Sequence, residues 1–266
     1  MTARHLMRAT VVRAGATDLL ASFPDRSIDV LLTDPPYTTI ERSAGNGAHL
    51  QDWFRGGMGW PEIGRVLALA RRKLKPSGLA FVMTNAAGLD QAIAAVKHAG
   101  FRDVRPITWD KRTPGLGGGL RHQIEFVLLG RLPGSRPVTG IDLVSVAAVG
   151  PGTRDRYPTE KPEALGRTLA AIAGVGSGDV VVDPFAGSGA LLAGARARGA
   201  TVIGGDIAAR AVRRATARLV GPAKPRSAPS RKPPRPSLVG RRPAGRRPIE
   251  TRHAARRPTP RRPRHG

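Results

Sequence analysis

The chain of 266 residues contains no cysteine, which excludes disulfide bonds, thiolate nucleophiles, Cys-ligated zinc and iron–sulfur clusters. Aromatic residues make up only 4% of the chain, and 19 acidic residues stand against 44 Lys and Arg, so the formal net charge is +25. No apolar run approaches the roughly 18 residues that a membrane helix needs, and residues 1–15 lack the apolar segment of a secretory signal. We therefore expect a soluble, intracellular protein with an anionic partner.

The positive charge is concentrated in residues 221–266. This segment holds 15 Lys and Arg against one acid, Glu250, together with 11 of the 24 prolines and none of the aromatic residues. It cannot bury enough apolar surface to fold, so we predict a folded domain over residues 1–220 and a disordered basic tail over 221–266. The tail is either a solvated, self-repelling extension or an arm that adds salt-sensitive affinity for nucleic acid phosphates.

Residues 1–220 alternate short β-branched runs with longer amphipathic patterns, which predicts an α/β fold with a doubly wound, mostly parallel sheet. Seven strands are expected, at Thr10–Arg13, Ile28–Thr33, Leu79–Thr84, Val104–Trp109, Ile124–Leu129, Val180–Asp183 and Thr201–Gly205. Apolar residues at helical spacing predict helices over Ile63–Leu74, Leu89–Ala99, Glu163–Ala173, Ser188–Ala197 and Ala208–Leu219. Two long stretches, Thr38–Trp60 and Leu132–Pro158, fit no element, and loops of this length are usually functional.

The strand Ile28–Thr33 ends in Asp34-Pro35-Pro36-Tyr37, at the sheet edge where open α/β sheets hold their ligands. The two prolines remove backbone donors, so the turn presents acceptors, the Asp34 carboxylate and the Pro35 carbonyl, beside the flat ring of Tyr37. Such acceptors suit the NH₂ group of adenine or cytosine, because holding its hydrogens frees the nitrogen lone pair for attack on an electrophilic methyl group. The alternative is an ordinary turn after a strand, since Asp-Pro pairs commonly start turns.

A second strand runs into Asp183-Pro184-Phe185-Ala186-Gly187-Ser188-Gly189 and then into a helix. The glycines permit a tight turn and close approach of a ligand, and Asp206 ends the next strand, where a carboxylate can accept from ribose hydroxyls. The turn departs from the G-x-G-x-x-G fingerprint of dinucleotide sites, and the chain has no phosphate-binding loop of the NTPase type. These features predict a pocket for a nucleoside with a charged tail, namely S-adenosylmethionine.

Together the two motifs resemble those of DNA amino-methyltransferases, which methylate adenine N6 or cytosine N4. Asp-Pro-Pro-Tyr precedes the cofactor motif, and Tyr157-Pro158-Thr159-Glu160-Lys161-Pro162 leads into a helix before it. This circularly permuted order resembles the β class of the family. Further matches are Pro24-Asp25-Arg26-Ser27-Ile28-Asp29, Leu74-Lys75-Pro76-Ser77-Gly78, and Trp109-Asp110-Lys111 followed by Arg121 and Glu125. The resemblance covers about residues 9–220 and implies a Rossmann-like class I methyltransferase fold.

The resemblance implies roles for particular residues. Asp34, Pro35, Pro36 and Tyr37 would hold the target base and stack on it. The cofactor would contact Asp183, Pro184, Phe185, Ala186, Gly187, Ser188, Gly189 and Asp206, and Thr159 and Lys161 would close over its methionine end. Thr159 could instead cap the following helix with support from Glu160, and Phe185 could be core. Family members usually carry Gly-Asp near Ala14-Gly15, and the acid near this position here is Asp18, so either Asp18 substitutes or cofactor affinity is lower.

The implied activity is methylation of adenine N6 in double-stranded DNA, with the target base flipped out of the helix and no metal required. Asp at position 34 favours adenine over cytosine N4; an RNA substrate and an idle DNA-binding protein are two further hypotheses. Sequence recognition would come from the two long stretches and from Arg112, Arg121, Arg131, Arg136 and Arg154 at phosphates or guanine edges. A homodimer and a cognate restriction endonuclease stay open as partners, and we expect a cytoplasmic, nucleoid-associated protein.

Overall fold

The computed structural model describes residues 9–37, 57–115, 119–150, 157 and 159–220. By its contacts the chain divides into two units, Met1–Ala223 and Lys224–Gly266, and every described residue belongs to the first. The predicted tail, most of Thr38–Trp60 and residues 151–156 and 158 therefore lie outside the described part. Within that part, no helix has the length and apolar composition to cross a membrane.

The described residues form one sheet of eight strands in the order β1-β8-β7-β2-β3-β5-β4-β6. The strands are β1 (Ala9–Arg13), β2 (Ile28–Thr33), β3 (Leu74–Thr84), β4 (Asp103–Asp110), β5 (Ile124–Arg131), β6 (Leu143–Ser145), β7 (Val180–Asp183) and β8 (Thr201–Asp206). Only β5 runs antiparallel to its neighbours, β3 and β4, so the mostly parallel α/β sheet is confirmed. The predicted number of seven strands is wrong, because β6 adds an eighth of three residues, too short for a periodic pattern.

Six α-helices and one 3₁₀ turn connect the described strands. They are α1 (Ala16–Ala21), α3 (Trp60–Lys73), α4 (Leu89–His98), α5 (Glu163–Ile172), α6 (Ala190–Arg196), α7 (Ala209–Val220) and η2 (Ala86–Gly88). In α3 the residues Ile63, Val66, Leu67 and Ala70 are buried at the predicted spacing. The helix ends at Lys73, because Leu74 already begins β3. The six-residue helix α1 has no detectable period in the sequence and was not predicted.

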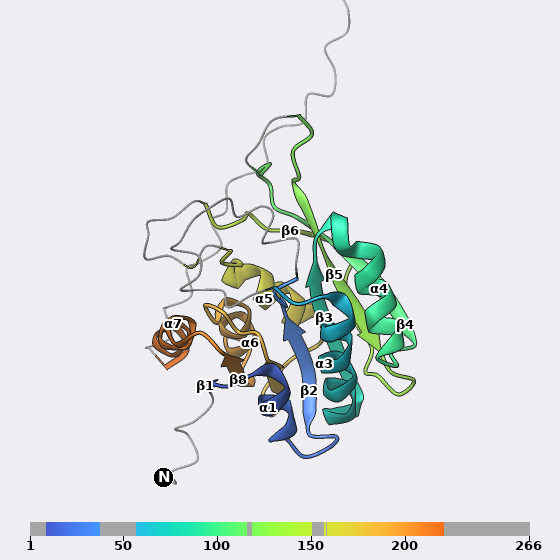
Figure 1. Ribbon diagram of the computed structural model, residues 1–266, viewed down its shortest axis with the longest axis vertical. Helices are drawn as coiled ribbons and strands as arrows, with labels where there is room; N and C mark the ends of the chain where they lie inside the picture. Colours follow the sequence, from blue (N-terminus) through green and yellow to red (C-terminus); the bar gives the residue numbers. More distant parts are fainter. Residues whose placement is uncertain (1–8, 38–56, 116–118, 151–156, 158, 221–266) are drawn as a thin grey trace, which may run out of the picture. The chain divides into compact units, whose positions relative to one another are not determined.

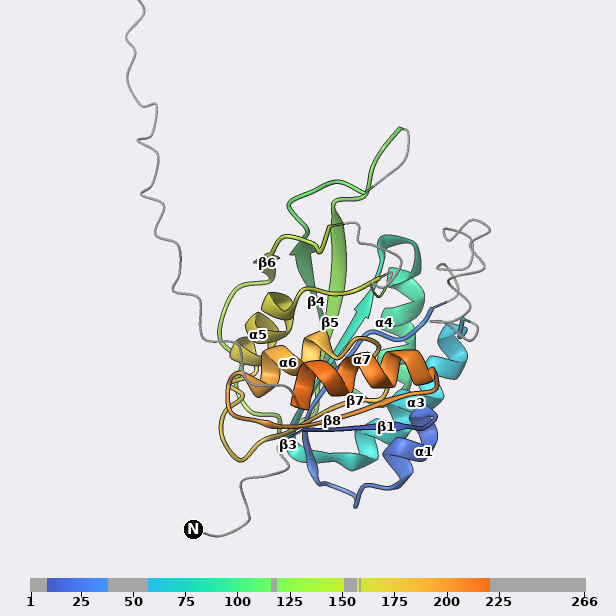
Figure 2. The ribbon, with the colours of Figure 1, turned by 90° about the vertical axis from the view of Figure 1, so that its left-hand side faces the viewer.

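Successive side chains of the central strands enter two separate cores. Val30 and Leu32 of β2 pack with α5 and α6, whereas Ile28 and Leu31 pack with α1, α3 and α4. Figures 1 and 2 show these two groups of helices on opposite sides of the sheet. Burial on both faces explains why the strands read as continuous apolar runs.

The neighbouring strands β2 and β7 form the switch point of the sheet. From β2 the chain continues through α3 to β3 on one side, and from β7 it continues through α6 to β8 on the other. The connections leave in opposite directions, so the carboxyl ends of β2 and β7 border a crevice, which is where doubly wound folds bind ligands. The two sequence motifs follow these two strands.

A network of charges ties the sheet together at its opposite, amino edge. Asp29 accepts from Lys75 Nζ (2.8 and 2.9 Å), from Arg136 Nη2 (2.9 Å) and from the backbone N–H of Val180 (2.9 Å). Arg136 also makes two hydrogen bonds to Asp179, at 2.9 and 3.0 Å. The prediction that Arg136 contacts DNA is therefore wrong, because its guanidinium is engaged by two carboxylates far from the crevice. Arg131 ends β5 at the same edge and pairs with Asp103 (3.4 Å).

Loss of the Asp29 carboxylate is expected to destabilise the fold. Asp29→Ala removes the shared acceptor of Lys75, Arg136 and Val180, so the free energy of unfolding should fall by about 3 kcal/mol. Asp103→Ala is the matched control, because Asp103 is a partly exposed carboxylate that also pairs with two arginines; its loss should cost less than about 1 kcal/mol. Urea unfolding with unchanged m-values measures both. Equal losses in the two variants would contradict the structural role of Asp29.

Candidate active site

Three carboxylates gather at the carboxyl ends of three neighbouring strands. Asp34 follows β2, Asp183 ends β7 and Asp206 ends β8, and all three line one cavity of about 400 Å³. A volume of this size lies within the usual range for small-molecule sites. The structure thus brings the two sequence motifs, about 150 residues apart in the chain, into one site.

The turn over residues 183–189, called the cofactor turn after its predicted role, follows β7. Asp183 holds this turn to β2. Its Oδ1 accepts a hydrogen bond from Thr33 Oγ1 (2.6 Å) and another from the backbone N–H of Phe185 (3.0 Å). Burial raises the pKa of Asp183 to about 7, although both hydrogen bonds act in the opposite direction. Asp183 therefore fixes the turn against the neighbouring strand, next to the cavity.

Asp206 holds the other side of the same turn. Its Oδ2 accepts from the backbone N–H of Gly187 (3.0 Å), and its Oδ1 accepts from that of Ala208 (2.8 Å). Burial raises the pKa of Asp206, and the two amides partly offset this effect. A carboxylate has about four lone-pair sites, so Asp206 retains acceptor capacity for ribose hydroxyls.

The glycines of the turn serve two different purposes. Gly187 has φ +50°, and a Cβ there would lie 2.9 Å from the Tyr157 ring, so a side chain would displace that ring from the cavity wall. Gly189 has φ +74° and precedes α6, and a Cβ there would lie 2.9 Å from Ala215 of α7. Gly189 does not line the cavity. Its absent side chain allows α7 to pack closely.

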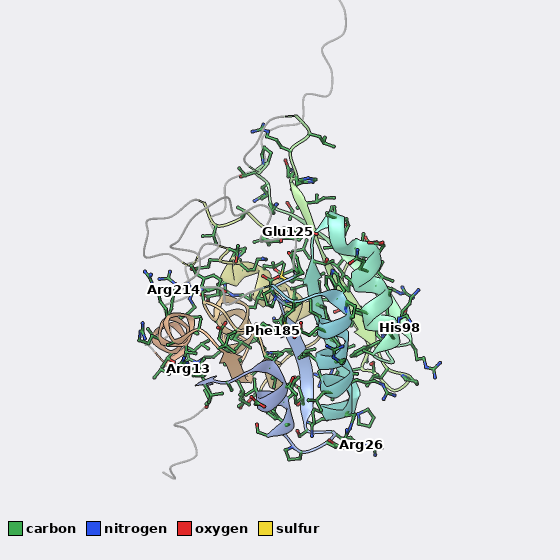
Figure 3. The ribbon with its side chains drawn as sticks, viewed as in Figure 1. Arg13, Arg26, His98, Glu125, Phe185 and Arg214 are labelled. Carbon is green, nitrogen blue, oxygen red and sulfur yellow. The ribbon has the colours of Figure 1, made fainter. Side chains whose placement is uncertain are left out.

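Most of the predicted site residues line the cavity. These are Asp18, Asp34, Pro35, Pro36, Thr159, Lys161, Asp183, Pro184, Phe185, Ala186, Gly187, Ser188 and Asp206. Tyr37 does not: its ring stacks on Trp60 with centroids 5.9 Å apart, and the residue is only 5% exposed. Phe185 comes two residues after the end of β7, and Figure 3 shows it in the central part of the molecule.

The two carboxylate oxygens of Asp34 differ in their surroundings. Oδ2 accepts from Lys161 Nζ at 2.6 Å, whereas Oδ1 is buried and has no hydrogen-bond partner within the part of the chain that the structure describes. Burial raises the pKa of Asp34, and Lys161 offsets only part of that effect. Burial lowers the pKa of Lys161, but Asp34 and Glu125 together outweigh it and raise that pKa above its ordinary value. Lys161 is therefore a permanent ammonium beside an acceptor that has one oxygen free.

The carbonyl oxygens of Pro35 and Pro36, which line the cavity, are further hydrogen-bond acceptors. The Pro35 carbonyl accepts from the backbone N–H of Tyr37 (2.9 Å), and the Pro36 carbonyl accepts from that of Met58 (2.6 Å). A carbonyl oxygen has two lone pairs. Each carbonyl can thus accept a second hydrogen bond from a ligand.

The segment before α5 is fixed over the cavity by ion pairs. Glu160 accepts from Arg214 (3.1 Å) and from Arg218, both on α7, and Arg218 also donates to Ser188 in the cofactor turn (3.3 Å). The hypothesis that Thr159 caps the helix is wrong, because α5 begins at Glu163 with Pro162 at its N-cap position. Glu160 likewise pairs with α7 instead of supporting the first turn of α5 (Arg214 is labelled in Figure 3).

Several residues of the site were not predicted from the sequence. Tyr157 and Glu160 line the cavity, Trp60 covers Tyr37, and Glu125 lies beside Lys161. Tyr157 and Glu160 belong to a motif of which only Thr159 and Lys161 were assigned. Within the described residues, no group of three His, Asp or Glu could hold a metal ion.

Comparisons with known proteins agree with this geometry. A family model described as DNA methylase, for N6 and N4 methyltransferases, matches residues 133–217. The Type II methyltransferase M2.LlaDCHI of Lactococcus lactis subsp. cremoris is 27% identical over 229 residues, covering 74% of this chain and 84% of that protein. The TTHA0409 protein of Thermus thermophilus, complexed with S-adenosylmethionine, is 26% identical with a TM-score of 0.54, covering 80% and 96%. PvuII DNA methyltransferase, named as cytosine-N4-specific, shares the fold at 16% identity, with a TM-score of 0.62 and coverage of 80% and 87%.

The fold is that of class I methyltransferases, and the comparisons support S-adenosylmethionine as the cofactor. The family that the DNA methylase model and the Type II relatives support for this chain is the DNA amino-methyltransferases. The chain is thus an S-adenosylmethionine-dependent enzyme that acts on DNA.

Proposed function

We propose that the enzyme methylates the exocyclic N6 amine of adenine in DNA after flipping the base into the cavity. The observation that carries this proposal is that Asp34 Oδ1 is buried and has no hydrogen-bond partner among the described residues. A buried acceptor without a partner costs about 1–3 kcal/mol. The cost is offset when an amine N–H of the target base donates to that oxygen.

The chemistry follows from the acceptors around the amine. Asp34 Oδ1 and the Pro35 carbonyl would each accept one N–H, which withdraws the nitrogen lone pair from the ring and directs it outward. When bound, S-adenosylmethionine supplies the electrophilic methyl group. Asp34 holds the amine in line with that group, and the surplus proton leaves to Asp34 or to solvent. Asp206, Gly187, Asp18 and Thr159 would hold the cofactor on the other side of the cavity.

Flipping is needed because the amine lies inside the stacked duplex, and it costs a few kcal/mol. Tyr37 is the proposed stacking residue for the flipped base. A base can stack there only if the ring gains an open face, because Trp60 covers one face and the residue is buried. We therefore infer that Tyr37 moves relative to its neighbours when DNA binds.

Adenine is preferred in this proposal because Asp stands at the first position of the motif, in the circularly permuted order of the β class. Methylation of cytosine N4 is the second candidate, since its amine presents the same two hydrogens and PvuII DNA methyltransferase shares the fold. Arg112 and Arg121, on the loop between β4 and β5, remain the proposed DNA contacts among the described arginines. The basic tail over residues 221–266 is proposed to add phosphate affinity to the catalytic domain.

The Type II names of the relatives support a role in restriction–modification, and we propose a cognate endonuclease as functional partner. A homodimer is a separate proposal that follows only from the resemblance. Light scattering of the purified protein in solution gives its mass and tests the dimer directly.

Expression in a bacterial host free of DNA methylation tests the proposed function. Single-molecule sequencing of the host DNA should show N6-methyladenine at one short motif, and an Asp34→Ala strain should show none. N4-methylcytosine at such a motif would replace the adenine proposal by the second candidate. An unmodified genome in cells that contain folded protein would contradict both and point to an RNA substrate or an idle DNA-binding protein.

A further inference from the structure

Four charged side chains form a line of alternating sign that begins at Asp34. Lys161 Nζ lies 2.6 Å from Asp34 Oδ2 and 3.7 Å from Glu125 Oε2, and Glu125 Oε1 lies 3.3 Å from Lys111 Nζ. The side chains are 11–20% exposed. Two carboxylates and two ammonium groups balance each other, which limits the cost of keeping all four away from water.

Glu125 is held in this line by the sheet. It is the second residue of β5 and lies opposite Trp109 of β4, and Lys111 follows directly after β4. Asp110, the last residue of β4, links the two ends of the loop between β4 and β5. Its Oδ1 accepts from the Arg112 N–H (2.9 Å) and from Gln123 Nε2 (2.8 Å). Figure 3 shows Glu125 near the start of β5, where the loop between β4 and β5 ends. The carboxylate therefore has a defined position relative to Lys161.

The contact between Glu125 and Lys161 is unusual in one respect. Among the described residues Glu125 Oε2 is buried without a hydrogen bond, although the Lys161 ammonium is 3.7 Å away. Lys161 donates to one oxygen of Asp34 only, and the other oxygen stays unpaired. One ammonium is thus shared between two carboxylates: it donates to Asp34 Oδ2 and forms a longer ion pair with Glu125 Oε2.

We propose that Glu125, backed by Lys111, is a positioning residue for methyl transfer. Its charge draws the Lys161 ammonium away from the midpoint of the Asp34 carboxylate, so that Lys161 engages Oδ2 and leaves Oδ1 for the amine of the target base. This inference rests on the proposed function, in which Asp34 Oδ1 accepts that amine. It also gives Lys161 a place at the base site, in addition to the cofactor role that the resemblance implies.

The electrostatics of the site support this arrangement. Glu125 raises the pKa of Lys161 and that of Asp34. Among the described residues, Tyr37, Tyr157 and Asp183 also interact electrostatically with the pair. Without the Glu125 charge the pKa of Asp34 falls, so the acid limb of the pH–rate profile, where Asp34 gains a proton, should move to lower pH.

The variant Glu125→Gln tests the proposal, because Gln preserves the shape of the side chain and removes its charge. We expect kcat to fall about 10- to 100-fold, as for other small misplacements of reacting groups. The KM values for DNA and for S-adenosylmethionine should change less than about threefold, since Glu125 touches neither ligand in the proposed complex. Glu163→Gln is the matched control, because Glu163 is an exposed carboxylate on α5 that pairs with Arg167; it should leave kcat and the pH profile unchanged.

A double variant shows whether Glu125 acts through Lys161. In a Lys161→Met background, Glu125→Gln should cause no further loss of kcat, because the group that it positions is absent. Lys111→Met should lower kcat in the same direction as Glu125→Gln, and it provides the test if Glu125→Gln unfolds. Thermal unfolding of each variant shows whether the fold is intact.

Three outcomes would overturn the proposal: unchanged kcat and pH profile in Glu125→Gln, a rise in KM alone, or losses that multiply in the double variant. If the wild type methylates DNA and Glu125→Gln behaves as wild type, only this inference fails. If the wild type methylates neither adenine nor cytosine, the proposed function fails and the inference falls with it.

Discussion

Methyl transfer to DNA is expected to fall by about 10³-fold when Asp34 is replaced by Ala. The variant loses the free acceptor Oδ1, so the amine of the target base keeps its lone pair conjugated with the ring. S-adenosylmethionine should still bind with a dissociation constant within about threefold of the wild-type value, because Asp183 and Asp206 hold the cofactor turn without Asp34. Single-turnover kinetics and isothermal titration calorimetry measure the two quantities.

Two variants control for a general disturbance of the site. Asp34→Asn keeps the size of the side chain, but its single oxygen should accept from Lys161 and turn the NH₂ group toward the target amine, so it should be nearly as inactive. Asp90→Ala removes an exposed carboxylate from the first turn of α4 and should be fully active. A rate above one tenth of wild type in Asp34→Ala, or a parallel loss of cofactor binding, would remove Asp34 from the base site.

Most of the fold could be predicted because its signals are local. The buried strands are continuous apolar runs, and the stripe Ile63, Val66, Leu67 and Ala70 has helical spacing over several turns. The elements that were missed are short: β6 has three residues and α1 has six. Elements of this length are stabilised by the neighbours against which they pack, and a sequence window does not contain those neighbours.

The site could be predicted in part for a different reason. Asp34, Asp183 and Asp206 each follow a predicted strand, and parallel strands bring their carboxyl ends to one edge of the sheet. The antiparallel strand β5 breaks this rule, because its first residues lie at that edge and its last residues at the other. For this reason Glu125 reaches Lys161, whereas Arg131, which ends the same strand, lies with Asp103 at the far edge.

Ion pairs between residues far apart in the chain account for the remaining differences between the predicted and the observed positions of charged side chains. Arg136 was expected to face DNA because nothing near it in the sequence indicated a partner, yet Asp29 lies 107 residues away in the chain. Glu160 was similarly assigned to the nearest helix, but it pairs with Arg214 and Arg218 of α7. A charged residue in a loop has several distant partners available, and only the packed structure decides among them.

Replacement of Asp206 by Asn should weaken the binding of S-adenosylmethionine more than it lowers kcat, whereas Asp34→Ala should lower the rate and leave cofactor binding nearly unchanged. The amide has one acceptor oxygen, so it cannot serve the N–H groups of both Gly187 and Ala208 and also accept from the cofactor ribose. Hydrogen bonds to a charged acceptor contribute about 1.5–3 kcal/mol each, so the dissociation constant for S-adenosylmethionine should rise about 100-fold. At saturating cofactor, kcat should fall less than about tenfold, because Asp34 and its free oxygen are unchanged. Asp142→Asn, an exposed carboxylate outside the cavity, is the matched control.

A ribose analogue separates contact with the cofactor from support of the turn. The wild type should bind S-adenosylhomocysteine more tightly than its 2′-deoxy analogue, whereas Asp206→Asn should bind the two with similar affinity if the carboxylate accepts from the ribose. Undiminished discrimination in Asp206→Asn would mean that Asp206 acts only by holding Gly187 and Ala208. In that case another carboxylate of the cavity wall, Asp18, is the candidate acceptor for the ribose.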